Sequence, residues 1–248
     1  MQKKLTRMLH LEREPVGIYF ANTESVCDVD ADPKNRNCVV PFLMRASEGT
    51  TVSMDEQSCN CAGGATGCCF GDGFARLNPS INKLLSQGYG DNAPVPEFMK
   101  KGERFFCSEE VAQKFRDGLP YSEKAYPRIV FAPMSRWEEI GQPDLVFLFL
   151  NPDQLGAVAG MLSFHNGRNP NMIAPYCSAC QSIMFGARQM EQQEPMAVLG
   201  LFDISQRYAP LANLLSLTMP YSIWADLSVD LDKKCVTTHS WQAIEKRL

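Results

Sequence analysis

The chain has 248 residues, of which 45% are hydrophobic and 21% are charged, a composition typical of a globular protein and not of a disordered one. Its formal net charge of −4 offers no basic surface to a nucleic acid, so we expect no nucleic-acid partner. A chain of this length can bury a sizeable core. We therefore predict a single domain over residues 1–248, with two closely packed lobes (about 1–125 and 126–248) as the alternative.

The first half of the chain carries both helical and strand patterns. Leu5, Met8 and Leu9 recur at helical spacing. Pro41 is tolerated in the first turn of a helix, and Ser108 is a typical N-cap. The patterns predict helices at residues 2–13, 39–49, 78–90 and 108–118, and strands at 14–21 and 50–56. Residues 88–103 form the longest irregular connection.

The second half alternates more regularly. Apolar runs rich in β-branched residues predict buried strands at 128–134, 144–150 and 195–202. Asn151 followed by Pro152 indicates the start of a helix. We expect helices at 151–167, 178–190, 221–231 and 240–248, and a helix that runs into a short strand over 204–220. The alternation predicts an α+β fold, in which helices cover a mixed sheet and the cysteine site lies at strand–helix junctions.

The sequence also predicts the compartment. The amino-terminal residues lack the apolar stretch of a secretory signal, and the run at 145–150 is too short to cross a bilayer. We therefore expect a cytoplasmic protein with no membrane partner, whose thiols stay reduced. Ten cysteines are too few for a disulfide scaffold in a chain of this length, yet many for a cytoplasmic protein with structural thiols alone.

Four of the ten cysteines lie within residues 58–73, together with five glycines. Cys38, Cys61 and Cys177 each lie on the amino side of a predicted helix, where the thiol pKa is lowered and the thiolate becomes a better metal ligand. Gly63 and Gly64 would let backbone amides approach a cluster sulfide or an anion. Three thiols at three helix starts suit a soft metal centre.

The cysteine spacing leaves several interpretations open. The chain has one CxxC pair, Cys177 and Cys180, and neither zinc-ribbon nor ferredoxin spacing occurs. The three histidines lie in unrelated segments. A metal or iron–sulfur site, a reactive or redox thiol, and buried structural cysteines all remain open. The isolated cysteines are assigned to packing or to the surface; they are Cys27, Cys107 and Cys235.

A set of motifs along the whole chain carries a family resemblance. In order, they are "EPVGIYF", Cys38, "CAGGATGCCFG" at 61–71, "VFLFLNPDQ", Cys177 and "SLTMPYSIW". Together they resemble the domain of unknown function 169 family, whose members are mostly prokaryotic and common in anaerobes and archaea. The most specific element is the Cys-x-Gly-Gly step, which the family follows with a Gly-Phe-like pair. This chain departs from that pattern with Phe70-Gly71.

The resemblance implies that Cys38, Cys61 and Cys177 are the family's recurring cysteines. It also implies a setting in which iron–sulfur chemistry survives, so we expect an iron–sulfur cluster, of the 4Fe–4S type, with zinc as the alternative. Three protein ligands would leave one iron open to a small molecule. The fourth ligand stays undecided among Cys59, Cys68 and Cys180, with Cys69 as a further departure. An iron–sulfur oxidoreductase with an electron-transfer partner and a non-enzymatic sensing module are both compatible with these residues.

Overall fold

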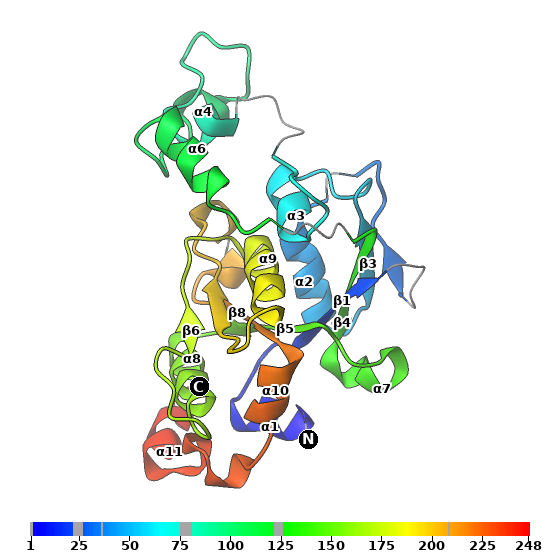
Figure 1. Ribbon diagram of the computed structural model, residues 1–248, viewed down its shortest axis with the longest axis vertical. Helices are drawn as coiled ribbons and strands as arrows, with labels where there is room; N and C mark the ends of the chain where they lie inside the picture. Colours follow the sequence, from blue (N-terminus) through cyan, green and yellow to red (C-terminus); the bar gives the residue numbers. More distant parts are fainter. Residues whose placement is uncertain (1, 22–26, 36, 75–80, 122–125, 208) are drawn as a thin grey trace.

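A mixed β-sheet forms the centre of the molecule (Figure 1). The structure is a computed structural model that describes residues 2–21, 27–35, 37–74, 81–121, 126–207 and 209–248. In this part of the chain the strand order is β2-β3-β4-β1-β5-β8-β7-β6. The pairs β2–β3 and β6–β7 are parallel, and all other neighbours are antiparallel. The strands are β1 (Val16–Ala21), β2 (Val29–Asp30), β3 (Val52–Asp55), β4 (Arg128–Pro133), β5 (Leu145–Leu150), β6 (Met172–Ile173), β7 (Ala197–Gly200) and β8 (Leu215–Pro220).

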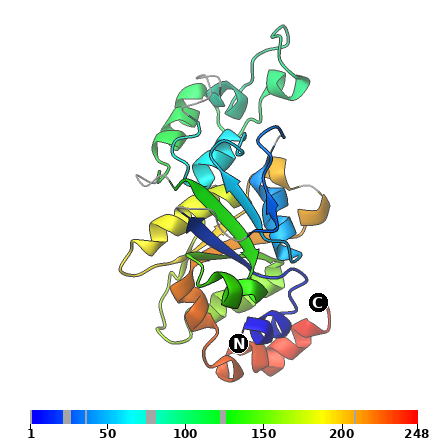
Figure 2. The ribbon, with the colours of Figure 1, turned by 90° about the vertical axis from the view of Figure 1, so that its right-hand side faces the viewer.

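Helices cover both faces of this sheet, which confirms the predicted α+β fold (Figure 2). They are α1 (Gln2–Met8), α2 (Val39–Ser47), α3 (Ala62–Gly67), α4 (Ile81–Leu85), α5 (Glu97–Lys101), α6 (Glu109–Asp117), α7 (Trp137–Ile140), α8 (Pro152–Leu162), α9 (Ala179–Met190), α10 (Tyr221–Leu227) and α11 (His239–Glu245). None of the described helices is long and apolar enough to cross a membrane.

Strand β5 shows how the two faces form separate cores. Successive side chains of a strand point to opposite faces. The odd-numbered residues of β5 pack in a core with α2, α3 and α9. Its even-numbered residues pack in a second core with α1, α8, α10 and α11. All six residues are buried, so this strand is apolar throughout and does not alternate with polar residues.

A third, smaller apolar cluster joins the sheet domain to the segment that contains α4, α5 and α6. Cys69, Phe74 and Ile81 contribute to it, together with Met184 of α9. In Figure 1 this segment lies at one end of the long axis, beyond α3, whereas α1 and α11 lie at the other end. The N-caps of α3 and α9, Cys61 and Ser178, line a hollow together with residues of this segment.

Several predicted helices are shorter in the structure, among them those at 2–13 and 221–231, which end at Met8 and Leu227. The helix predicted at the start of 204–220 is wrong: two 3₁₀ turns, η2 (Ile204–Gln206) and η3 (Ala209–Leu211), precede β8. Asp203 accepts a hydrogen bond from the backbone N–H of Ser205, which favours a turn, and Pro210 has no N–H with which to continue a helix. The irregular connection at 88–103 contains the short helix α5. The predicted cap of α4, Asn78 with Pro79, lies outside the described residues.

Candidate functional site

Three cysteines lie at the amino ends of three helices on the same face of the sheet. Cys38 is the N-cap of α2 and Cys61 is the N-cap of α3, as their positions before the helices predicted. The backbone N–H of Gly64 donates a hydrogen bond to the Cys61 sulfur at 3.4 Å. Helix α9 begins at Ser178, whose side chain and that of Gln181 form a capping box, and Cys180 lies in its first turn.

Cys180 connects α9 to α3. Its sulfur lies 3.6 Å from the carbonyl oxygen of Gly63 and 3.0 Å from the hydroxyl of Ser178. The side-chain amide of Gln206 approaches the same sulfur at 3.9 Å. Only 2% of the residue is exposed, so these polar groups, and not water, surround the thiol.

Cys38, Cys61 and Cys180 form one electrostatic group, which we call the thiol cluster. Burial is the main cause that raises the pKa of Cys38, and negative charge on Cys61 and Asp203 adds to it. Burial also raises the pKa of Cys180 well above its usual value, with further contributions from Cys61 and Cys38. Burial and the charge of neighbouring thiols therefore both favour the protonated forms of Cys38 and Cys180.

Cys59 and Cys68 lie behind the thiol cluster in the apolar core. Burial raises the pKa of Cys68 well above its usual value, and Cys59, Cys180, Cys69 and Cys61 contribute to this shift. The Cys59 sulfur lies 3.8 Å from the carbonyl oxygen of Cys61. Each of the two thiols is at least 95% buried and packed among apolar side chains.

The structure brings Cys180, and not Cys177, to the thiol cluster. Cys177 directly precedes the N-cap of α9, and its sulfur lies 3.7 Å from the carbonyl oxygen of Leu199 in β7. A Cβ atom on Gly200 of the same strand would lie 3.2 Å from that sulfur. Burial alone raises the pKa of Cys177 to about 12. Its thiol therefore packs against the sheet.

The raised pKa of Cys177 predicts an alkaline loss of stability. The folded state binds the Cys177 thiol proton more tightly than the unfolded chain does. The stabilisation from the protonated thiol is therefore fully present below pH 9 and is lost as the pH rises toward 12. With reductant present, the free energy of unfolding of the parent should fall between pH 8 and pH 10. In Cys177→Ala this fall should be smaller by about 1–1.5 kcal/mol. Urea unfolding at both pH values measures this. Cys107→Ala, at an exposed thiol, should follow the parent, and an unchanged fall in Cys177→Ala would contradict the prediction.

The glycines of α3 have different roles. A Cβ on Gly67 would lie 2.4 Å from the backbone oxygen of Cys180, so only glycine allows α3 to approach α9 this closely. A Cβ on Gly64 would lie 3.1 Å from the Cys59 sulfur, and it therefore has a packing role besides donating its amide to Cys61. Gly63 is less confined, because its nearest neighbour would be Phe74 at 3.8 Å.

A partly open hollow of about 350 Å³ adjoins the thiol cluster, and we call it the aromatic pocket. Cys61 and Gly63 line it, as do polar side chains that surround the start of α9 and η2: Ser178, Gln181, Asp203, Ser205 and Gln206. The other walls are mainly apolar and come from the segment with α4, α5 and α6, which also contributes Glu103, together with Tyr176. The cysteine site therefore has a route to a small ligand.

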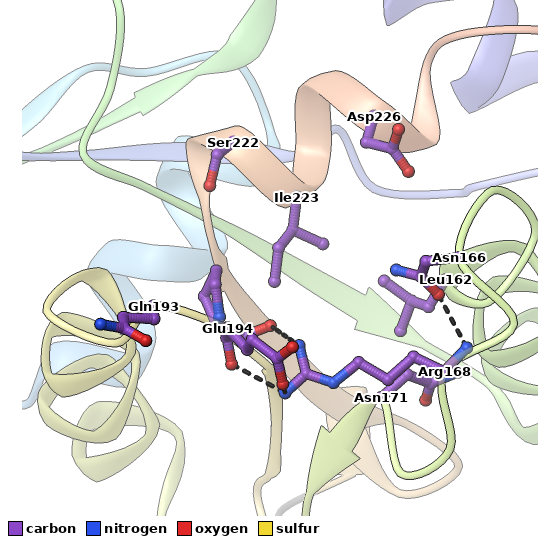
Figure 3. A pocket seen from close by; sticks show the side chains of 10 residues that line it. Leu162, Asn166, Arg168, Asn171, Gln193, Glu194, Ser222, Ile223 and Asp226 are labelled. Atoms are coloured by element: carbon purple, nitrogen blue, oxygen red, sulfur yellow. Dashed lines mark hydrogen bonds and ion pairs between the residues drawn. The ribbon is translucent and has the colours of Figure 1, made fainter.

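A larger hollow of about 560 Å³ lies on the opposite half of the molecule, beside α8 and α10 (Figure 3). Arg168 crosses it, and its guanidinium donates to the backbone oxygens of Glu194 and Pro195 and lies 3.5 Å from the Glu194 carboxylate. These interactions of Arg168 hold the loop that follows α9 in place. The residues that line this hollow include no cysteine or aromatic side chain, and we do not assign the site to it.

The remaining cysteines lie apart from the thiol cluster. Cys107 is exposed, Cys27 lies near Asp30, and the Cys235 sulfur contacts the carbonyl oxygen of Ala157 in α8 at 3.5 Å.

Among the described residues, no three His, Cys, Asp or Glu side chains are already arranged to hold a metal ion. In the thiol cluster, the donors fit a soft centre by their chemistry, and coordination requires their side chains to turn toward a common point.

Comparison with known proteins identifies a family for the chain. A family model described as DUF169, uncharacterised ArCR, matches residues 4–228. No curated protein and no solved structure matches the chain. The description of the family assigns no activity, so any function rests on the site itself.

Proposed function

The chain belongs to this DUF169 family, and we propose that its thiol cluster holds an iron–sulfur cluster at the wall of the aromatic pocket. One observation carries the proposal. Three cysteines from separate segments of the chain, Cys38, Cys61 and Cys180, lie at three helix starts, and Cys61 is close enough to both others to contribute to their raised pKa. Sequence reasoning favoured Cys177 for the third position, whereas the contacts described above favour Cys180.

The surroundings of the three sulfurs suit an anionic soft centre. Thiolates select iron–sulfur clusters and zinc over magnesium or calcium. Helices α2 and α9 direct the positive ends of their dipoles toward the site. The amides of Gly64 and Gln206 approach the sulfurs, and hydrogen bonds of this kind tune the potential of a cluster.

Loading of the site must displace protons. Because burial raises the pKa of Cys38 and Cys180, both thiols are protonated near neutral pH in the metal-free protein. Metal affinity should therefore increase as the pH rises. The same shifts disfavour the reactive-thiol alternative for these two residues, since a neutral thiol is a poor nucleophile.

A bound cluster would supply redox chemistry or an open iron for a small ligand. With three protein ligands, Cys38, Cys61 and Cys180, one iron would be left without a protein ligand, and Cys61 would hold the cluster beside the aromatic pocket that it lines. We propose an oxidoreductase or electron carrier that works in the cytoplasm, where thiols remain reduced. A zinc-binding sensor is the second candidate, because the same thiolates bind zinc.

Anaerobic reconstitution with iron and sulfide tests the proposal. The loaded protein should be brown and absorb broadly near 400 nm, and zinc should compete for the same thiols. A colourless protein that takes up zinc in place of iron would favour the sensor. A protein that binds neither metal would contradict both candidates and leave the thiols with a structural role.

A further inference from the structure

The aromatic pocket has the size and lining of a small-molecule site. Its volume of about 350 Å³ lies at the lower end of the range for such sites. Its apolar walls include Ile81 and Leu84 of α4 and Phe115 of α6. Because residues from the sheet domain and from the α4–α6 segment both line it, the site depends on how these two parts pack together.

Four aromatic rings form a compact group on one side of the pocket. The ring of Tyr176 lies 5.6 Å from Phe105, 6.5 Å from Phe106 and 6.1 Å from Phe115, each in an edge-on arrangement. Phe106 and Phe115 lie 4.9 Å apart. Phe105, Phe106 and Phe115 are therefore packed edge-on against Tyr176 and do not form one flat stack with it, and all four rings line the pocket.

The charges of the pocket have a single sign. Glu103 and Asp203 are its charged lining residues, and no Lys or Arg is among those described as lining it. Both carboxylates lie near Tyr176: burial, followed by Asp203 and Glu103, raises the pKa of this phenol to about 12. Asp203 also accepts from the N–H and hydroxyl of Ser205, which fixes the position of its carboxylate.

A guanidinium lies against one wall and is already engaged. Arg116 is over the ring of Phe74 at 5.4 Å and donates to the side-chain oxygens of Asn82 and Gln113. It is 91% buried and held between α4 and α6. Because Arg116 already lies over the ring of Phe74, we assign the ligand to the faces of Phe105, Phe106 and Tyr176.

From the ring group and the two carboxylates we propose that the aromatic pocket binds a small organic cation, either a quaternary ammonium or a protonated amine. Aromatic faces attract such cations, and carboxylates that no lysine or arginine of the lining neutralises add to the attraction. The inference goes beyond the proposed iron–sulfur site and does not depend on it, because it uses none of the cysteines.

Binding of choline by the metal-free protein tests this inference. Isothermal titration calorimetry should show that choline binds about threefold to thirtyfold more tightly than its neutral isostere, 3,3-dimethylbutan-1-ol. Only the cation gains the interactions with the rings and the carboxylates. Equal affinity for the two, or no binding of choline at millimolar concentrations, would overturn the proposal whether or not the protein takes up iron.

Two variants separate the pocket from the rest of the surface. Tyr176→Leu removes a ring face, and Glu103→Gln removes a charge from a partly exposed side chain without changing its size. Each should weaken choline binding about threefold or more while leaving the weak binding of the isostere unchanged. Trp137→Leu, at an exposed aromatic residue outside the pocket, is the matched control and should bind choline as the parent does. Thermal unfolding verifies that each variant is folded, and unchanged choline affinity in folded Glu103→Gln and Tyr176→Leu would overturn the assignment.

Discussion

Replacing Gly67 with alanine is expected to destabilise the protein by about 2–3 kcal/mol and to disrupt the thiol cluster. The new Cβ would lie 2.4 Å from the backbone oxygen of Cys180 and 2.9 Å from the backbone nitrogen of Gln181. Backbone atoms in the first turn of a helix cannot move aside as a flexible side chain does. The strain must therefore push α3 away from α9, and with it Cys61 away from Cys180.

Gly63→Ala provides the matched control in the same helix. Its Cβ would meet only Phe74 at 3.8 Å, an ordinary contact, and alanine has the higher helix propensity. We expect this variant to be as stable as the parent or more stable by up to about 1 kcal/mol. Urea unfolding of the two metal-free variants measures the difference. If both variants unfold at the parent's midpoint, α3 and α9 do not meet as the structure describes.

Removal of a thiol-cluster sulfur is the second change with a large expected effect. Cys38→Ser, Cys61→Ser and Cys180→Ser should each lower the iron bound per chain about tenfold or more, because a hydroxyl is a hard and poor substitute for a thiolate. Cys61→Ser is the most informative of the three, since this side chain is only partly buried and its loss leaves the core intact.

Substitutions outside the thiol cluster serve as controls for this loss. Cys107→Ser and Cys235→Ser should retain the parent's iron, because Cys107 is exposed and Cys235 packs with the second core against α8. Cys177→Ala should lose stability, since it removes a fully buried sulfur, and yet keep its iron. Loss of iron in Cys177→Ala with full retention in Cys180→Ser would restore the ligand set predicted from the sequence and contradict the one proposed from the contacts.

Local signals were sufficient to predict much of the fold. Asn151 and Pro152 marked the start of α8, where the structure has a full capping box with Gln154. The apolar run that became β5 was correctly predicted as a buried strand. Cys38 and Cys61 were both predicted on the amino side of a helix, and each is an N-cap. A helical pattern follows Cys38 at residues 39–49, whereas the residues after Cys61 are rich in glycine.

The choice between Cys177 and Cys180 could not be made from the sequence. The two lie three residues apart at the start of one helix, a spacing that allows both to face the same side. In the structure, Cys177 precedes the N-cap and turns to β7, whereas Cys180 turns to α3. That outcome depends on the contact at Gly67, which is more than a hundred residues away in the chain, and no local pattern reports such a contact.

The aromatic pocket was missed for a related reason. Phe105 and Phe106 follow the segment predicted as an irregular connection, and Tyr176 precedes the helix with Cys180, so no shared motif links them. Their rings meet only because the α4–α6 segment packs onto the sheet domain through the third apolar cluster. The position at which these rings meet is therefore set by tertiary packing and not by a local pattern.

X-ray absorption at the iron edge tests most directly whether the thiol cluster holds an iron–sulfur centre. In the anaerobically reconstituted parent, the account predicts a first shell made of sulfur, with metal–sulfur distances near 2.3 Å, and its disappearance in the triple variant Cys38→Ser/Cys61→Ser/Cys180→Ser. A first shell of oxygen or nitrogen in the parent, or a sulfur shell that survives the triple substitution, would contradict the account.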